Sequence, residues 1–210
     1  MKIEYFGHSC FRFTDSFGQS LITDPYTGIG YELSNGLAAD IVTLSHNHYD
    51  HNAVHLIEHK HCIKEVGNYN IGNVRLFGVE SFHDEEGGKL RGKNTVYKMQ
   101  IDGITCCHLG DLGEPCHTAL IEKIGEVDIL FIPIGGHYTI DKDEAQTYIR
   151  RIQPKIVIPM HYKTADGTID ISSPDAFLKA FDKVERVGNM YVVNKEDLLN
   201  QEMKVVFMEK

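Results

Sequence analysis

The stretch Ser45-His46-Asn47-His48-Tyr49-Asp50-His51 places three histidines and one aspartate within six positions. It directly follows residues 41–44, a short and mostly apolar run that predicts a buried β-strand. Side chains alternate along an extended chain, so His46 and His48 point to the same side and can reach one metal ion. We therefore interpret this stretch as the start of a metal site.

Asp50 and His51 come where we predict the chain to turn into a helix over residues 50–60. A carboxylate near a helix N-terminus is favoured in its ionised form, which is the form that binds metal. Asp50 and His51 can thus reach a second metal ion. Imidazole with carboxylate is the ligand set typical of zinc, and manganese, iron or nickel also accept it.

Strand and helix patterns mix in both halves of the chain. Short β-like runs occur at residues 1–6, 10–14, 20–23, 41–44, 62–66, 74–77, 94–101, 104–107, 127–132, 155–158, 191–193 and 204–207. Further helices are predicted over residues 116–124, after the capping-box pair Asp141 and Glu144, and from Ser173 to about Val184. This order predicts an α/β (α+β) protein with two packed sheets and helices on their outer faces.

The composition restricts the class of protein. We expect one domain over residues 1–210, whose core is large enough to form without metal, so that a metal site serves function. The net charge of −9 disfavours tight non-specific binding to nucleic acid or to an anionic membrane, although a nuclease remains open. The longest apolar run, residues 129–134, is too short to span a bilayer. Five cysteines without a C-x-x-C pair favour a reducing cytoplasm.

Three further motifs follow downstream in a fixed order. His83 ends the sequence Glu80-Ser81-Phe82-His83, Asp111 lies in Leu109-Gly110-Asp111-Leu112-Gly113, and His161 lies in Ile158-Pro159-Met160-His161-Tyr162. The chain thus contains, in this order, an H-x-H-x-D-H motif, a single histidine, a G-D-x-G motif and another single histidine. This order of motifs resembles that of the metallo-β-lactamase superfamily. Residues 6–9 (Phe-Gly-His-Ser) and residues 133–137 resemble its smaller single-domain branch of ascorbate-6-phosphate-lactonase-like and Zn-dependent hydrolases.

The resemblance implies a four-layer αββα sandwich of two mixed β-sheets flanked by helices. It also implies two divalent metal ions, with zinc the first expectation. The first ion would be held by His46, His48 and His83, the second by Asp50, His51 and His161, and Asp111 would bridge them. Two ions that lie about 3.5 to 4 Å apart need such a bridging anion, and Gly110 and Gly113 would let the backbone approach closely.

Two of these assignments have alternatives. His83 lies in a polar loop, so an ordinary loop histidine is the competing interpretation, with Asp84 as a substitute ligand. His51, His55 and His59 recur every four residues and would share one face of the predicted helix, which permits a rival metal pair. We prefer a solvated helix end for His55 and His59, because the glutamate of an H-E-x-x-H motif is missing.

Other residues have weaker signals. His8 and His108 lie in or at the end of apolar strands, where structural hydrogen bonding is the first expectation and support of a metal ligand the second. His137 follows two glycines after a buried strand. One prediction is that it lies in the pocket, where it would hold substrate or stabilise developing negative charge. The other prediction is that it only forms part of a turn. Cations at positions 91, 93 and 163 could attract an anionic substrate, but solvated side chains are the simpler interpretation.

The leading functional hypothesis is a dinuclear metal-dependent hydrolase. A metal-bridging hydroxide would attack a small ester, lactone or phosphorylated metabolite, and Asp50 or Asp111 would relay the proton. The alternatives are a metal-dependent phosphodiesterase or nuclease and a non-catalytic metal-binding regulatory module. The expected partner is a small-molecule substrate. No membrane partner is expected, nucleic acid is disfavoured, and homo-oligomerisation is left open.

Overall fold

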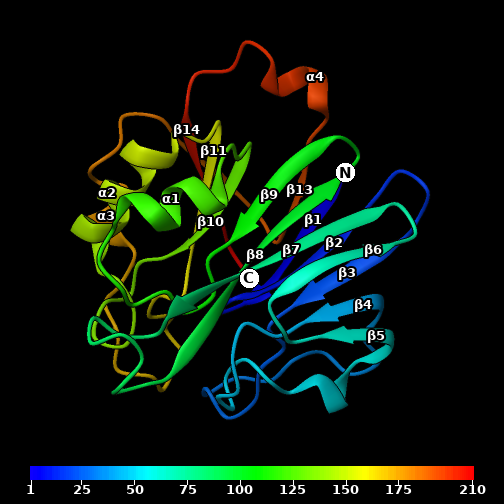
Figure 1. Cartoon of the computed structure of the whole chain (residues 1–210), viewed down its shortest axis with the longest axis horizontal. Coiled ribbons are helices and arrows are strands. Elements are labelled where there is room, and N and C mark those ends of the chain that lie inside the picture. Colours follow the sequence, from blue (N-terminus) through cyan, green and yellow to red (C-terminus); the bar gives the residue numbers. More distant parts are fainter.

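Two mixed β-sheets pack face to face in the computed structural model, which describes residues 1–210 (Figure 1). The six-stranded sheet has the order β13-β1-β2-β3-β4-β5, and the eight-stranded sheet has the order β12-β14-β11-β10-β9-β8-β7-β6. Both sheets combine parallel and antiparallel neighbours: β3 and β4 run parallel whereas β1 and β2 run antiparallel, and β10 and β11 run parallel whereas β7 and β8 run antiparallel. The predicted fold class is confirmed.

The strands of the six-stranded sheet are β1 (Lys2–Gly7), β2 (Cys10–Thr14), β3 (Ser20–Thr23), β4 (Ala38–Thr43), β5 (Glu58–Ile63) and β13 (Met190–Val192). Those of the eight-stranded sheet are β6 (Gly67–Ile71), β7 (Val74–Phe82), β8 (Lys93–Ile101), β9 (Ile104–His108), β10 (Ile129–Pro133), β11 (Ile156–Met160), β12 (Val184–Val187) and β14 (Lys204–Met208). The helices are short: η1 (Val54–Leu56), α1 (Thr118–Ile124), α2 (Lys142–Ile152), α3 (Asp175–Leu178) and α4 (Lys195–Leu198).

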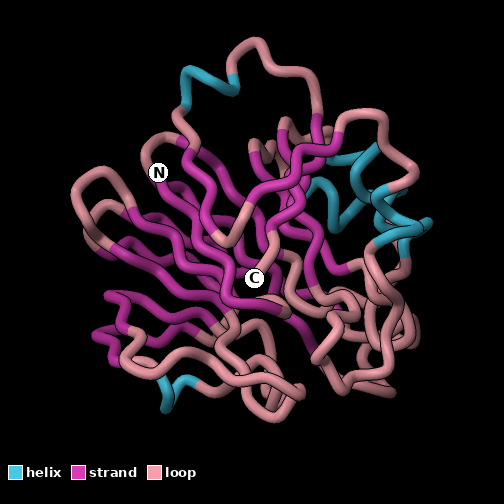
Figure 2. The backbone as a smooth tube through the Cα atoms, turned by 180° about the vertical axis from the view of Figure 1, so that it is seen from behind, coloured by secondary structure: helices cyan, strands magenta, loops and turns pink.

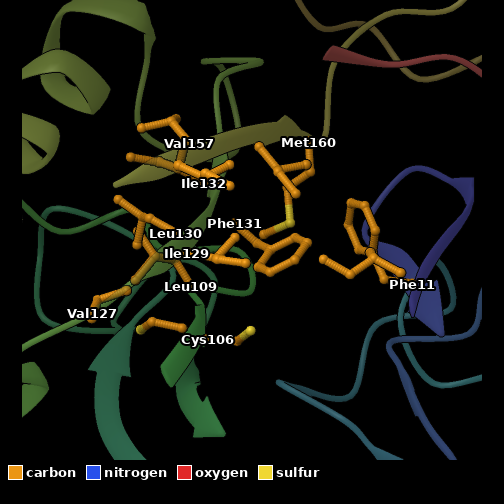
Figure 3. Packing of buried hydrophobic residues seen from close by; sticks show 14 of the residues in the cluster. Phe11, Cys106, Leu109, Val127, Ile129, Leu130, Phe131, Ile132, Val157 and Met160 are labelled. Atoms are coloured by element: carbon orange, nitrogen blue, oxygen red, sulfur yellow. The ribbon is translucent and has the colours of Figure 1, made fainter. Parts of the chain in front are cut away.

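Aromatic side chains join the two sheets across the main core. Phe11 and Phe13 on β2 lie with their ring centroids 4.8 and 5.1 Å from that of Phe131 on β10, in edge-to-face contacts. Figure 3 shows Phe11 and Phe131 facing one another. All three rings are fully buried, within a cluster of 43 buried residues. A buried phenylalanine of this kind typically contributes about 3 to 5 kcal/mol to the free energy of unfolding. The sandwich is therefore held together by apolar packing that involves no metal ligand.

Helices cover the outer face of the eight-stranded sheet. Strands β10 and β11 are buried at every position, because α1, α2 and α3 gather on that side of the sheet (Figure 1). Helix α2 begins with the predicted capping box, in which the Asp141 carboxylate accepts hydrogen bonds from the backbone N–H groups of Asp143 and Glu144. Its buried face consists of Ala145, Tyr148, Ile149 and Ile152, as the periodicity predicts.

The prediction of a helix over residues 50–60 is wrong. After a turn the chain forms only the short η1, and then β5, which pairs in parallel with β4 and takes up part of the predicted helix. Hydrogen bonds to β4 outweigh the local helical pattern, and β5 is an exposed edge strand. His55 and His59 consequently share no helix face with His51, which removes the rival metal pair.

Loops replace helices on the outer face of the six-stranded sheet. Tyr26, Ile29, Leu33 and Leu37, all from residues 24–37, form a second core of ten buried residues together with side chains of that sheet and Ile57. Figure 2 shows how loops collect at one end of the sandwich, while helices are few. The helical layer on this side is thus largely a loop layer.

Two further element boundaries differ from prediction. The helix expected from Ser173 to about Val184 stops at Leu178, and Val184 instead begins β12, which pairs in parallel with β14. Strand β6, an antiparallel neighbour of β7, was not predicted because three of its five residues are glycine or asparagine. No helix of this chain has the length and apolar character needed to cross a membrane.

Candidate metal centre

Every predicted ligand follows the carboxyl end of a strand. The first histidine stretch follows β4, His83 follows β7, Asp111 lies just beyond β9 and His161 directly follows β11. One of these strands belongs to the six-stranded sheet and three belong to the eight-stranded sheet. The carboxyl ends of strands from both sheets therefore converge at one end of the sandwich, where loops can place ligands from distant parts of the sequence side by side.

Three histidines form the first ligand group. The ring centroids of His46 and His48 lie 4.6 Å apart, and those two rings lie 4.7 and 5.0 Å from the ring of His83. One ring nitrogen from each lies within 4.8 Å of the other two. The carboxylate of Asp84 is occupied elsewhere, because it accepts four backbone hydrogen bonds within its own loop. His83, and not Asp84, is thus placed to complete this group.

The second group contains the three predicted ligands and one more histidine. Ligand atoms of Asp50, His51, His161 and His8 all lie within 4.8 Å of one another. His8 Nε2 lies 3.2 Å from Asp50 Oδ2, and the His8 ring lies at an angle of 42° to that of His161 with centroids 4.2 Å apart. The His8 side chain is therefore positioned to support Asp50, which is the second of the two roles expected for it.

Asp111 lies between the two groups. Its Oδ1 is 3.0 Å from His51 Nε2, and its Oδ2 is 3.2 Å from both His83 Nε2 and His161 Nε2 and 3.7 Å from His46 Nε2. The turn that presents it needs glycine: Gly110 has a φ of +57°, and a Cβ there would lie 2.6 Å from Ser45 Cβ. Asp111 is thus the single carboxylate within reach of both groups.

The polar atoms at this centre fit metal ions better than they fit one another. His46 Nε2, His51 Nε2 and Asp111 Oδ1 are buried and have no hydrogen bond of acceptable geometry, although they lie close together. Buried polar atoms in proteins almost always have a partner. Five imidazoles and two carboxylates that converge with free nitrogen and oxygen atoms are the donor set expected for zinc or a similar divalent ion. The residues present therefore fit two metal ions.

Burial and charge set opposite protonation states in neighbouring imidazoles. Burial lowers the pKa of His46 to about 3 and that of His8 to about 4. Burial by itself would also lower the pKa of His51, but the carboxylates of Asp111, Asp24 and Asp50 raise it well above its usual value. In the metal-free chain His46 is therefore neutral at pH 7, whereas His51 carries a proton.

Asp24 is a supporting residue that the sequence did not reveal. Its Oδ2 lies 2.9 Å from His51 Nδ1 and accepts a hydrogen bond of 2.6 Å from the Ser45 hydroxyl, while its Oδ1 accepts one from the Ser45 backbone N–H. A carboxylate on Nδ1 fixes the tautomer that leaves Nε2 free for metal. The only local sign was an aspartate directly after strand β3.

His108 has the structural role expected of it. Its Nδ1 accepts a hydrogen bond from the Gly110 backbone N–H, so Nε2 carries the proton and donates to the Ser9 carbonyl 2.9 Å away. Ser9 lies in the β1–β2 turn of the six-stranded sheet, whereas His108 ends β9 of the other sheet. The imidazole thus links the two sheets close to the candidate metal ligands.

A pocket of about 690 Å³ opens over the two ligand groups. Its wall includes His48, Asp50, His83, Asp111 and His161, and also the side chains Tyr49, Arg91, Tyr138 and Asp170. This volume is typical of sites for small molecules.

His137 does not line this pocket; its neighbour Tyr138 does. The residue has a φ of +55° in a tight turn, where the Tyr138 N–H donates to the Gly136 carbonyl, and its side chain is exposed. The turn therefore presents Tyr138 in place of the histidine that was expected to act on substrate. Of the three cations considered, only Arg91 reaches the pocket, since Lys93 pairs with Glu80 and Lys163 donates to the Ile169 carbonyl.

Metal binding to the second group is expected to release a proton. His51 holds one in the metal-free chain because its pKa is raised, and a ligating imidazole must give it up. The affinity of this group should therefore rise with pH, by about tenfold per pH unit for one proton. Calorimetric titration with Zn²⁺ in buffers of different ionisation enthalpy measures the protons released. A second-group affinity that stays constant between about pH 6 and 8 would contradict a protonated His51.

The comparisons with known proteins agree with this geometry. A sequence model described as the β-lactamase superfamily domain matches residues 2–161. A relative from Staphylococcus saprophyticus, named UPF0173 metal-dependent hydrolase, is 33% identical, and the match covers 78% of this chain and 86% of the relative.

Solved structures extend the likeness to the whole chain. A crystal structure from Thermotoga maritima, of a protein assigned to the Zn-dependent hydrolases of the metallo-β-lactamase superfamily, has a TM-score of 0.82 at 40% identity and covers 99% of this chain and 98% of that one. A metallo-hydrolase from Ignicoccus hospitalis has a TM-score of 0.70 at 21% identity over 99% of this chain and 94% of that one, and shows the shared fold alone. With its strand-end ligands, its paired sheets and these relatives, the chain belongs to the metallo-β-lactamase superfamily and is a metal-dependent hydrolase.

Proposed function

We propose that the protein is a dinuclear hydrolase that cleaves a small ester, lactone or phosphorylated metabolite with water. The observation that carries the proposal is the position of Asp111, whose two oxygens lie within 3.2 Å of imidazoles from both ligand groups. His46, His48 and His83 would hold one ion, and Asp50, His51 and His161 the other. Divalent ions bound there supply Lewis acidity and lower the pKa of water.

Asp50 is the better placed of the two carboxylates to move a proton. It lines the pocket, and its side chain is 13% exposed, whereas that of Asp111 is 2% exposed and enclosed by imidazoles. Burial by itself would raise the pKa of Asp50, but the hydrogen bond to His8 and the charge of His51 lower it, so the carboxylate is ionised at neutral pH. We infer that Asp50 Oδ2, held by His8 Nε2, passes a proton from water to the leaving group.

Water is the nucleophile that fits this pocket. None of the side chains that line it is a serine or a cysteine. Burial raises the pKa of the Cys10, Cys106 and Cys107 thiols, so these three cysteines stay protonated and unreactive. The size of the pocket favours a small-molecule substrate over a macromolecule.

A substrate panel with the zinc-loaded protein tests this proposal. The panel contains lactones, 4-nitrophenyl esters, sugar phosphates and bis(4-nitrophenyl) phosphate, and the Asp111→Asn variant, purified in the same way, reports contaminating activity. We expect turnover of lactones or carboxylic esters that the variant lacks. Turnover confined to bis(4-nitrophenyl) phosphate would favour a phosphodiesterase. Two bound ions per chain without any turnover would favour a metal-binding module.

A further inference from the structure

Arg91 lies in the pocket wall with its charge unpaired. It is the only lysine or arginine among the side chains that line the pocket. Its guanidinium makes no hydrogen bond and no ion pair within the chain, although Asp170 lines the same pocket. The residue is half-buried. The guanidinium of an arginine is planar and carries five N–H donors. A half-buried guanidinium whose N–H groups have no hydrogen-bond acceptor is suited to bind an oxyanion.

The loop that carries Arg91 is built around the carboxylate of Asp84. Oδ1 of this buried side chain accepts hydrogen bonds from the backbone N–H groups of Glu86 and Gly88, and Oδ2 accepts from those of Leu90 and Arg91, at 2.7 to 3.0 Å. These four bonds close the loop between β7 and β8 directly after the metal-ligand candidate His83. The backbone of Arg91 is therefore held in place relative to the first ligand group before any substrate arrives.

A second contact orients the side chain of Arg91. Its Cζ lies 5.5 Å from the centroid of the Tyr138 ring, which also lines the pocket. Stacking on a ring uses the face of a guanidinium and leaves the N–H groups at its edge free. The turn with Tyr138 is tied to the Asp111 segment, because the Ile140 N–H donates to the Leu112 carbonyl. Arg91 is thus positioned from both sides of the pocket.

We propose that Arg91 binds an oxyanion, carboxylate or phosphate, on the substrate at a distance from the bond that is cleaved. The inference rests on the proposed hydrolase function and narrows its substrate class to small anionic esters or lactones. Asp50 and Asp111 would be offset by metal ions, and Arg91 is the one lysine or arginine side chain among the residues that line the pocket. Its guanidinium can donate two parallel hydrogen bonds to two oxygens of a carboxylate or phosphate.

Matched 4-nitrophenyl esters test the proposal. The butyrate ester is neutral, the hemisuccinate and hemiglutarate carry a remote carboxylate, and the 3-phosphonopropionate carries a phosphonate. The rate without enzyme is subtracted for each ester, because the succinate and glutarate carboxylates also attack their own ester intramolecularly. For the zinc-loaded wild type we expect kcat/KM to be at least about tenfold higher for an anionic ester than for the butyrate. A pair of charge-assisted hydrogen bonds from one guanidinium is expected to give an effect of this size. Carboxylate and phosphonate esters together show which anion is preferred.

In Arg91→Gln the ratio of kcat/KM for the anionic ester to kcat/KM for the butyrate should fall to about one, and Arg91→Lys should retain part of the preference. Lys93→Gln is the matched control, because Lys93 is an exposed cation two residues away that does not line the pocket. An unchanged preference in Arg91→Gln, or no preference in the wild type, would overturn the proposal.

A measurement without turnover separates this proposal from the hydrolase function. Calorimetry with the zinc-loaded protein compares butyramide, succinamate and 3-phosphonopropionamide, which present the same anions on an amide. We expect an anionic amide to bind the wild type at least about tenfold more tightly than Arg91→Gln, with no difference for butyramide. If no ester is hydrolysed but this difference is found, the hydrolase proposal fails and the role of Arg91 stands. Equal binding to both proteins refutes the role of Arg91 whatever the activity.

Discussion

Replacement of Asp111 by asparagine is expected to lower kcat/KM at least about thousandfold and to reduce the metal content below two ions per chain. The side chain keeps its shape but loses the charge that lies within 3.7 Å of four imidazole nitrogens. Metal ions typically contribute several kcal/mol to stabilisation of a transition state, and about 4 kcal/mol corresponds to a thousandfold change in rate. Steady-state kinetics and elemental analysis of the purified variant measure the two effects.

Asp170→Asn is the matched control for this experiment. Asp170 lines the same pocket but belongs to neither ligand group, so its variant should keep both ions and most of the activity. The backbone N–H of residue 111 still donates to Asn94 Oδ1 in the variant, which should leave the turn intact. Full metal content and full activity in Asp111→Asn would show that this carboxylate does not join the two groups.

Removal of the metal by a chelator is expected to abolish hydrolysis and to leave the sandwich folded. The two sheets are joined by the 43-residue apolar cluster, which contains no predicted ligand. Each metal ion that binds only the folded state stabilises it by about 3 kcal/mol at a hundredfold excess over Kd, so two ions contribute about 5 kcal/mol. For a chain of 210 residues, the metal-free protein should therefore melt roughly 10 to 20 °C lower. Circular dichroism melts before and after chelation measure this shift, and added Zn²⁺ should restore activity.

Phe131→Ala should have the opposite effect to chelation, because it weakens the fold and leaves the metal ligands unchanged. Loss of the ring that contacts Phe11 and Phe13 should lower the free energy of unfolding by about 3 to 5 kcal/mol without altering the metal content of the folded protein. In the chelation experiment, global unfolding of the wild type would contradict this prediction and show that the metal ions hold the fold together.

Where the sequence succeeded, the signal was local. The spacing of His46 and His48 after a buried strand, and the apolar runs of β10 and β11, depend on residues close together in the chain. The helix predicted over residues 50–60 failed because β4 was available as a partner for β5, and such pairing has no signature within the segment itself. The same holds for β12, which β14 recruits from a predicted helix.

By itself the sequence indicated the fold class through strand periodicity, and its ordered motifs nominated the seven ligand candidates through their resemblance to a known superfamily. Only the tertiary structure decided which other side chains share the site. It placed Asp24 on His51, His8 beside Asp50, and Arg91 with Tyr138 in the pocket wall in place of His137. These neighbours are set by how the strands of two sheets converge, so residues far apart in sequence become partners that no local pattern encodes.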